Sequence, residues 1–200
     1  MARPRKDARG PSARERIEAT FWRLLEQKGY RDITVAALSR EAHVSPNTLY
    51  YHYDNIEAVA RSSFDKALMK EFPSLLLAQS REALDDEIRR QGDGIAQRIR
   101  RIGLFATDES GELRRIVVET FIEVWSESLG TTPDELTREE RIKLTFMANG
   151  VVSIFDLAHE GDFTALYVSM IDSHLVQGII AEMNAIKARH PHPAPDKRTS

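Results

Sequence analysis

Residues 33 to 53, ITVAALSREAHVSPNTLYYHY, constrain the fold more than any other stretch of this chain. Thr34 precedes apolar residues at helical spacing, and Ser45 followed by Pro46 marks the start of a second helix. A hydroxyl in the first of these positions can cap a helix, and a proline at the first helical residue loses no hydrogen bond. Only residues 42 to 44 remain as a connection. The two helices must therefore cross steeply, as in a helix-turn-helix.

The second of these helices carries more polar groups than one buried face accepts. Leu49 is expected to point inward with Leu38 and Val44, whereas neighbours one or two positions away must point elsewhere. Several side chains should therefore face a partner: Pro46, Asn47, Thr48, Tyr50, Tyr51 and His52. A small helical hairpin with an ordinary polar surface is the alternative interpretation.

Basic charge is concentrated ahead of this motif. Residues 1–16 hold six Lys or Arg against two acidic residues, and residues 1–53 hold ten against six, although the whole chain has a formal net charge of −3. A polyanion should therefore be drawn to the N-terminal end. We expect residues 1–12 to form a flexible arm whose Arg3, Arg5 and Lys6 follow DNA phosphates or enter the minor groove. Charge runs at a terminus are otherwise often merely solvated.

Another helix is predicted between this arm and the motif. Ser12 and Glu15 have the spacing of a capping box, so the helix should begin near Ala13, and Gly29 supplies the residue that ends it. Residues 13–55 are thus expected to form a compact three-helix domain.

From about residue 16 to residue 59 the chain resembles the TetR family of transcriptional regulators. The resemblance rests on Ile17, Leu24-Leu25, Gly29-Tyr30, Thr34-Val35, Leu38-Ser39, Glu41-Ala42, Val44-Ser45, Thr48-Leu49-Tyr50, His52-Tyr53, Asn55 and Glu57. It implies a dimeric, all-α protein with an N-terminal three-helix DNA-binding domain and a larger helical domain for effector binding and dimerisation.

The resemblance also implies roles for individual residues. Thr34, Thr48 and His52 should contact phosphates, and Pro46, Asn47, Tyr50 and Tyr51 should face the major groove. Ser45 is also expected to bind DNA. Three positions depart from the family pattern. His43 replaces a turn glycine and should adopt a left-handed conformation, Asn47 offers an amide for adenine, and Ile56 lacks a lysine's phosphate contact.

The remainder of the chain has helical periodicity throughout and no alternating strand pattern. We predict helices over residues 56–72, ended by Pro73, and over 80–91, 95–106, 112–129, 138–159 and 163–189. Residues 56–189 would form the effector-binding and dimerisation domain, and residues 190–200 a disordered tail.

In the TetR family the last two helices form the dimer interface. The corresponding residues here are Met147, Gly150, Ile154, Met170, Leu175, Gly178 and Ile179, although they could instead pack within one subunit. An apolar effector pocket would be lined by Ile99, Ile102, Phe105, Phe121, Trp125, Phe146, Phe155 and His159, for which ordinary core packing is the alternative.

These patterns predict a cytoplasmic repressor that binds a palindromic operator as a homodimer and is released by a small molecule. No catalytic motif, metal-ligand spacing, membrane span or cysteine occurs in the sequence, so we expect no enzyme activity, cofactor, metal or membrane partner. Two alternatives remain. The protein could be an enzyme, or it could be a helical interaction module that has lost DNA binding because of His43 and Ile56.

Overall fold

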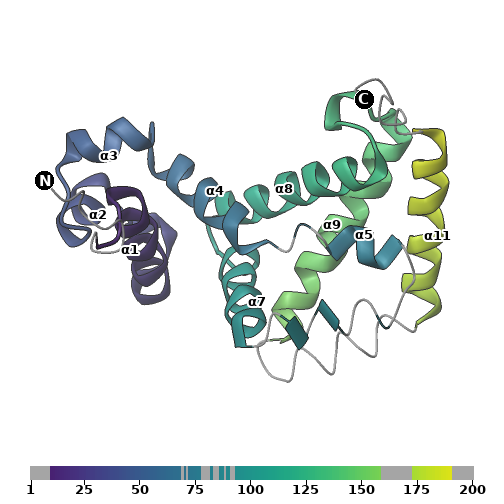
Figure 1. Cartoon of the computed structure of the whole chain (residues 1–200), viewed down its shortest axis with the longest axis horizontal. Helices are drawn as coiled ribbons and strands as arrows, with labels where there is room; N and C mark the ends of the chain where they lie inside the picture. Colours follow the sequence, from purple (N-terminus) through teal and green to yellow (C-terminus); the bar gives the residue numbers. More distant parts are fainter. Residues whose placement is uncertain are drawn as a thin grey trace, which may run out of the picture. The chain divides into compact units, whose positions relative to one another are not determined.

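The computed structural model describes residues 10–68, 70, 72–77, 82, 86, 87, 89, 90, 93–158 and 173–190, and these contain helices but no strands (Figure 1). This agrees with the predicted all-α class. The chain divides into two compact units, one formed by Met1–Ala67 with Asp108–Leu113 and the other by Leu68–Thr107 with Arg114–Ser200. Sequence analysis placed the domain boundary at residue 55, whereas here the helix that follows this residue groups with the N-terminal helices.

The first unit is built around helix α1, Ala13–Lys28, on which α2, α3 and α4 pack. After α1 come the short 3-10 helix η2, Tyr30–Asp32, then α2, Val35–Glu41, α3, Pro46–His52, and α4, Ile56–Ala67. One side chain from each of the four α-helices is fully buried in this core: Phe21, Leu38, Leu49 and Phe64. Burial of apolar side chains is the main force that holds such short helices together.

The predicted start and end of α1 and the predicted start of α2 are confirmed. Ser12 and Glu15 form both bonds of a capping box, and Gly29, at φ 76°, ends α1. Thr34 accepts the backbone N–H of Ala37 at the start of α2. Caps of this kind satisfy N–H groups that have no partner inside the helix.

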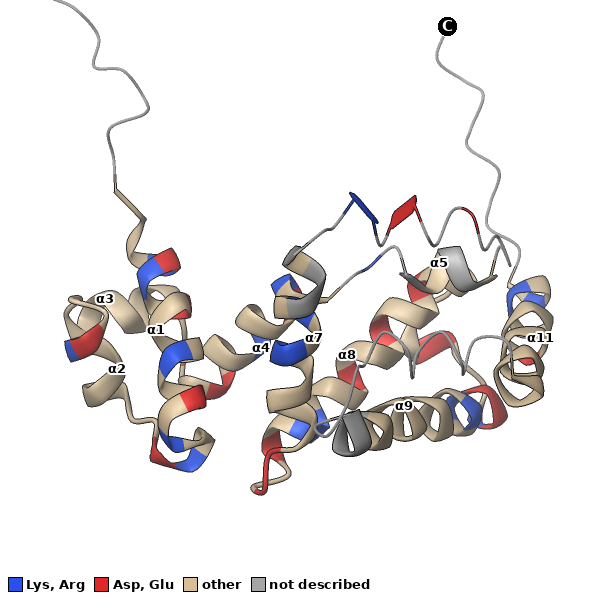
Figure 2. Cartoon of the chain, turned by 90° about the horizontal axis from the view of Figure 1, so that it is seen from below, with Lys and Arg blue, Asp and Glu red and all other residues tan. Residues whose placement is uncertain are grey.

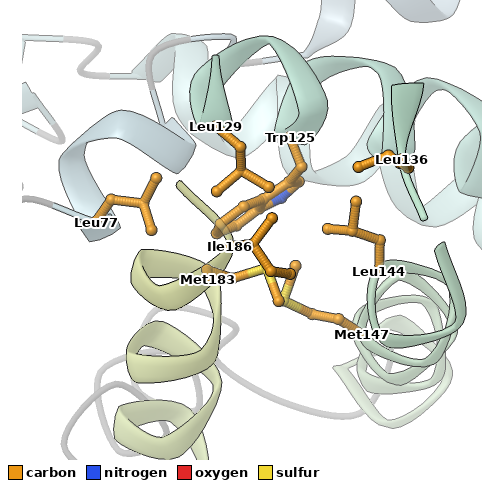
Figure 3. Close-up of a cluster of buried hydrophobic side chains, with 8 residues drawn as sticks. All are labelled: Leu77, Trp125, Leu129, Leu136, Leu144, Met147, Met183 and Ile186. Carbon is orange, nitrogen blue, oxygen red and sulfur yellow. The ribbon is translucent and has the colours of Figure 1, made fainter. Parts of the chain in front are cut away.

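The second unit contains α5, Phe72–Leu77, α7, Asp93–Ala106, and α8, Glu112–Leu129, followed by η3, Pro133–Glu135, α9, Arg138–Ala158, and α11, His174–Arg189. Helix α7 packs against α9, and α5 packs against α11. Side chains from α5, α8, α9, α11 and the segment before α9 form one apolar cluster (Figure 3): Leu77, Trp125, Leu129, Leu136, Leu144, Met147, Met183 and Ile186.

Two helix boundaries, the end of α4 and the start of α11, differ from the sequence prediction. Pro73 does not end a long helix, because α4 already ends at Ala67 and the proline lies in the first turn of α5. A proline is tolerated there since the first-turn N–H groups have no intrahelical acceptor. The last helix begins at His174 instead of Phe163, because the Ser173 side chain accepts the N–H of Val176 and caps it.

A buried carboxylate connects the start of α9 with the end of α11. The Glu140 side chain accepts the backbone N–H of Thr137 at 2.9 Å, and the N–H of Glu140 donates to the Thr137 hydroxyl, so the two residues form a capping box. It also accepts Nε of Arg189 at 3.0 Å and lies 3.3 Å from Nε2 of His190. Burial would raise the pKa of Glu140, but these hydrogen bonds outweigh it and hold the pKa at about 2.

Candidate nucleic-acid interface

Helices α2 and α3 are joined by a turn of defined geometry. The N–H of Val44 donates to the carbonyl of Ser39 at 3.0 Å, and the N–H of His43 donates to that of Arg40 at 3.2 Å. His43 has φ 53°, which confirms the left-handed conformation predicted for this non-glycine residue. This tight turn packs α3 against α2, which is the arrangement of a helix-turn-helix.

Paired hydroxyl groups cap α3. Ser45 Oγ accepts the N–H of Thr48 at 3.0 Å, and it lies 2.8 Å from Thr48 Oγ1. One hydroxyl hydrogen serves the bond between the two side chains, so the other can donate to an external acceptor. A hydroxyl donor at a helix N-terminus is suited to a phosphate oxygen, because the helix dipole also favours negative charge there.

The two faces of α3 differ as predicted. Leu49 is fully buried, whereas Tyr50 is 54% and Tyr51 84% exposed. Pro46, Asn47 and His52 are also exposed, and Thr48 is half-buried. The outer face thus presents amide, phenol and imidazole groups but no Lys or Arg. Such groups can read base edges in a major groove, whereas most attraction to phosphate must come from elsewhere.

In residues 10–67 of the first unit, positive charge is balanced by acidic residues (Figure 2). The sequence-predicted arm residues Arg3, Arg5 and Lys6 lie outside the described residues. Thr34 is described and exposed at the start of α2, and its bond to Ala37 leaves the hydroxyl hydrogen available to donate.

Residues that support α3 were missed by the sequence analysis. Arg16 Nε donates to the carbonyl of Ala42 at 3.2 Å, which ties α1 to the turn. Glu18 is buried on α1 and accepts the hydroxyl of Tyr53, the residue that caps the end of α3, at 2.6 Å. A signal for Glu18 existed, since it shares a helix face with Trp22 and Leu25, where a carboxylate requires partners.

Two short helices joined by a tight turn, the second capped by hydroxyls and exposing polar side chains, have the architecture of a helix-turn-helix. Residues 18–62 match the family model described as "Bacterial regulatory proteins, tetR family". Residues 18–62 therefore form a DNA-binding domain of the TetR family, which supports a DNA-binding transcription regulator. No curated protein matched the chain.

The residues predicted to line an effector pocket do not share one environment. Phe105 and Trp125 are buried, and Ile99, Ile102 and Phe121 are partly buried. Phe121 stacks on Trp125 with ring centroids 5.6 Å apart. Phe146 is 74% exposed and lies on an open groove instead. The Phe155 side chain and His159 lie outside the described part of the chain.

The open groove runs between α9 and α11 and brings together most described residues of the predicted dimer interface. It has a volume of about 460 Å³, and its lining includes Phe146, Met147, Leu175, Gly178 and Ile179. Of the other predicted interface residues, Gly150 is exposed and Ile154 is partly buried, both on α9, whereas Met170 lies outside the described residues.

The described residues contain neither a helix that could cross a membrane nor a cluster of three or more metal-ligating side chains.

Proposed function

We propose that this protein is a dimeric repressor that binds a palindromic operator and is released from it by a small apolar molecule. The observation that carries the proposal is the apolar groove between α9 and α11, which we take as the dimer interface. A dimer is needed because a single recognition helix reads too few base pairs for an operator. Two copies joined at this groove would present two α3 helices to successive major grooves.

The groove has the composition of an interface. Phe146 and Leu175, which face it, are 74% and 64% exposed, and Ile142 beside them is 59% exposed. At its edge Lys143 pairs with Glu182 at 2.7 Å. An apolar centre with a charged rim is typical of protein–protein contacts, and grouped apolar side chains of this size are seldom left to solvent.

Glycines on the same helices support this assignment. A Cβ added to Gly150 on α9 or to Gly178 on α11 would meet no atom within 4 Å. Packing within the described part of the chain therefore does not require glycine at either position. Close approach of a helix from a second copy would require it, and glycine inside a helix otherwise lowers stability.

Effector binding is proposed for α7 and α8. Ile99 and Ile102 on α7 are partly buried, and so is Phe121 on α8, which stacks on the buried Trp125. Partly buried apolar side chains next to a packed core can exchange water for an apolar ligand at little cost. Helix α4 packs on α1 in the DNA-binding unit, and the second unit follows it in the chain at Leu68. We propose that a ligand-dependent shift reaches α3 through α4.

Sedimentation of the protein at micromolar concentration tests the dimer. We expect wild type to sediment as a dimer and Phe146→Glu as a monomer. Ala188→Glu serves as the control, because it introduces the same charge at an exposed position of α11 that does not line the groove. A monomeric wild type, or equal effects of the two substitutions, would overturn the proposed interface.

DNA binding and release are tested with two kinds of duplex. One kind is selected by the protein from a random-sequence library, and the other is the DNA upstream of its own gene. We expect the selected sequences to be palindromic. Compounds that raise the melting temperature in a thermal-shift screen are then titrated against the bound duplex. If none of them lowers the affinity, the ligand-released repressor is wrong, and failure to select any sequence favours an interaction module.

A further inference from the structure

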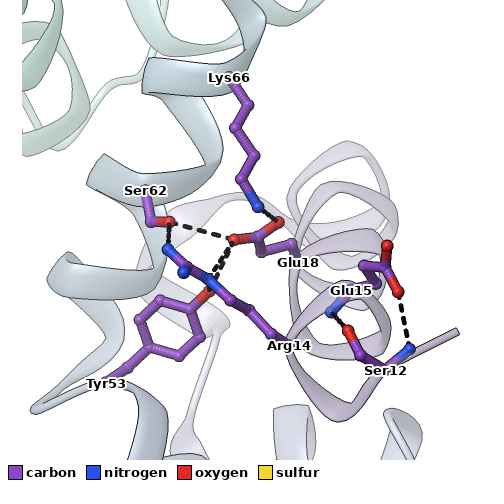
Figure 4. A network of polar contacts seen from close by, with 7 residues as sticks. All are labelled: Ser12, Arg14, Glu15, Glu18, Tyr53, Ser62 and Lys66. Atoms are coloured by element: carbon purple, nitrogen blue, oxygen red, sulfur yellow. Dashed lines mark hydrogen bonds and ion pairs between the residues drawn. The ribbon is translucent and has the colours of Figure 1, made fainter.

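A buried carboxylate joins three parts of the DNA-binding unit. Glu18 lies on α1 with 7% of its surface exposed. Its oxygens accept donors from the residue that ends α3 and from two positions of α4 (Figure 4). A charge in such a place is tolerated only when several donors satisfy it.

Three groups from outside α1 donate to the Glu18 carboxylate. The Tyr53 hydroxyl donates to Glu18 Oε1 at 2.6 Å, and the Ser62 hydroxyl donates to the same oxygen at 3.1 Å. Lys66, one turn beyond Ser62 on α4, pairs with Oε2. Together with Glu18 these residues are called the Glu18 network.

Arg14 completes the Glu18 network from the first turn of α1. Its Nε donates to the Tyr53 hydroxyl at 3.1 Å, and its Nη2 donates to the Ser62 hydroxyl at 3.0 Å. Each hydroxyl therefore accepts from Arg14 and donates to Glu18. Because each hydroxyl uses a donor and an acceptor, a different position of α4 on α1 would break both Ser62 bonds, and a different position of the end of α3 would break both Tyr53 bonds.

The electrostatics of Glu18 agree with this geometry. Burial raises the pKa of the carboxyl, but hydrogen bonds from Lys66, Tyr53 and Ser62 outweigh it and leave the pKa below its ordinary value. Glu18 is therefore held as an anion. Buried ionic networks often contribute little net stability compared with apolar side chains, so a role in fixing orientation accounts better for this one.

The position of Tyr53 determines what the Glu18 network controls. Tyr53 follows the last residue of α3, and its N–H donates to the carbonyl of Leu49 at 2.9 Å. Its hydroxyl thus fixes the end of the recognition helix against α1, while Ser62 and Lys66 fix α4 against the same carboxylate. The end of the recognition helix and α4 are therefore both bound to the same carboxylate, that of Glu18.

We propose that Glu18 and Tyr53 are positioning residues for sequence recognition, which hold α3 at the angle that fits base edges and make this angle depend on the position of α4. The proposal rests on the proposed role of α3 as reader of the operator. Neither residue needs to touch DNA. Misorientation of α3 reduces contacts to base edges, whereas attraction to phosphate, which depends on charge, tolerates it.

The test compares affinities of Tyr53→Phe for two duplexes of equal length, one selected by the wild-type protein and one of unrelated sequence. The substitution keeps the net charge and the buried ring. We expect the ratio of the two affinities to fall about tenfold, within the range of typical coupling between sites. Tyr30→Phe, at another buried tyrosine of the unit, is the matched control and should leave the ratio unchanged.

A second measurement separates positioning from simple loss of folded protein. Destabilisation lowers the affinity for both duplexes equally, so it leaves their ratio constant. The double variant Glu18→Gln/Tyr53→Phe should lose no more of the ratio than the larger single effect, because the two residues act through one bond. Hydrogen exchange of residues 56–67 should also become faster in Tyr53→Phe.

An unchanged affinity ratio in Tyr53→Phe and in Glu18→Gln overturns the positioning role. The positioning role is also overturned if the effects of the two substitutions on the affinity ratio are additive, or if Tyr30→Phe lowers the ratio as much as Tyr53→Phe does. A wild-type protein that prefers no duplex overturns the proposed function instead, and that result is obtained before any variant is made.

Discussion

The Arg16 side chain spans the first helix and the helix-turn-helix turn: its Nε donates to the carbonyl of Ala42 at 3.2 Å, and its Nη1 donates to that of Pro11 at 2.9 Å. Ala42 ends α2 and begins the turn that places α3. A guanidinium is suited to this position, because it carries several donors in a rigid planar group.

Replacing Arg16 by Gln should destabilise the DNA-binding unit. Loss of hydrogen bonds from a charged donor lowers the free energy of unfolding by roughly 1.5–3 kcal/mol, measured by urea denaturation. Arg31→Gln removes the same charge from an exposed side chain of η2 and should change it by less than about 0.5 kcal/mol. Equal effects would mean that the bond to Ala42 does not hold the turn.

His43→Gly should stabilise the protein, because the residue has φ 53° and its side chain is exposed. Glycine reaches this conformation without steric strain, so we expect a gain of roughly 0.5–1 kcal/mol in thermal or urea unfolding. Ala19→Gly, at an exposed position inside α1, should lose about as much. Loss of stability at both positions would contradict the left-handed turn.

Glu140 should make stability depend on pH in acid. Its folded pKa of about 2 lies below the ordinary value of 4.5, so its contribution is complete above pH 4.5 and is lost as the pH falls toward 2. We expect Glu140→Gln to remove on the order of 1–2 kcal/mol of this dependence, a figure reduced by solvent around Arg189.

The measurement for Glu140 is the difference in unfolding free energy between wild type and variant at several values of pH. Glu127→Gln, which removes a carboxylate from an exposed position of α8, is the control and should change the free energy of unfolding by less than about 0.5 kcal/mol. If unfolding free energy depends on pH in the same way in wild type and in Glu140→Gln between pH 4.5 and 2, the bonds from Arg189 and Thr137 do not lower the pKa of Glu140.

Asn47→Ala should relax base preference at one position of each half-site. The amide is exposed on α3 and can pair with adenine, so we expect a loss of roughly 1–3 kcal/mol on the preferred base and little on the others. Thr48→Ala should weaken binding to all sequences about equally, because its role is at phosphate. Competition assays with single-base variants of the selected duplex distinguish the two patterns.

Removal of residues 1–9 should reduce the salt dependence of DNA binding. These residues hold four Lys or Arg and one acidic residue, whereas residues 10–53 are close to neutral. Pro11 is retained because its carbonyl accepts from Arg16. If the arm neutralises about two phosphates, the slope of log affinity against log salt falls by roughly two. An unchanged slope would show that the arm does not contact DNA.

The sequence by itself determined where most helices of the DNA-binding unit begin and end. Ser12 with Glu15, Thr34 and Ser45 act on backbone groups only three residues away, and Gly29 acts through its own conformation. Interactions over such short separations form whatever the rest of the chain does, so a pattern of residue types predicts them.

Only the tertiary structure decided which side chains meet across the fold. The bond from Arg16 to Ala42 spans 26 residues, and that from Lys66 to Glu18 spans 48. In the sequence Glu18 is one more carboxylate on an amphipathic helix, and Phe146 is one more aromatic residue. Whether a carboxylate is buried with its donors, or an aromatic ring is left on an open groove, depends on how helices pack, because local propensity carries no information about distant partners.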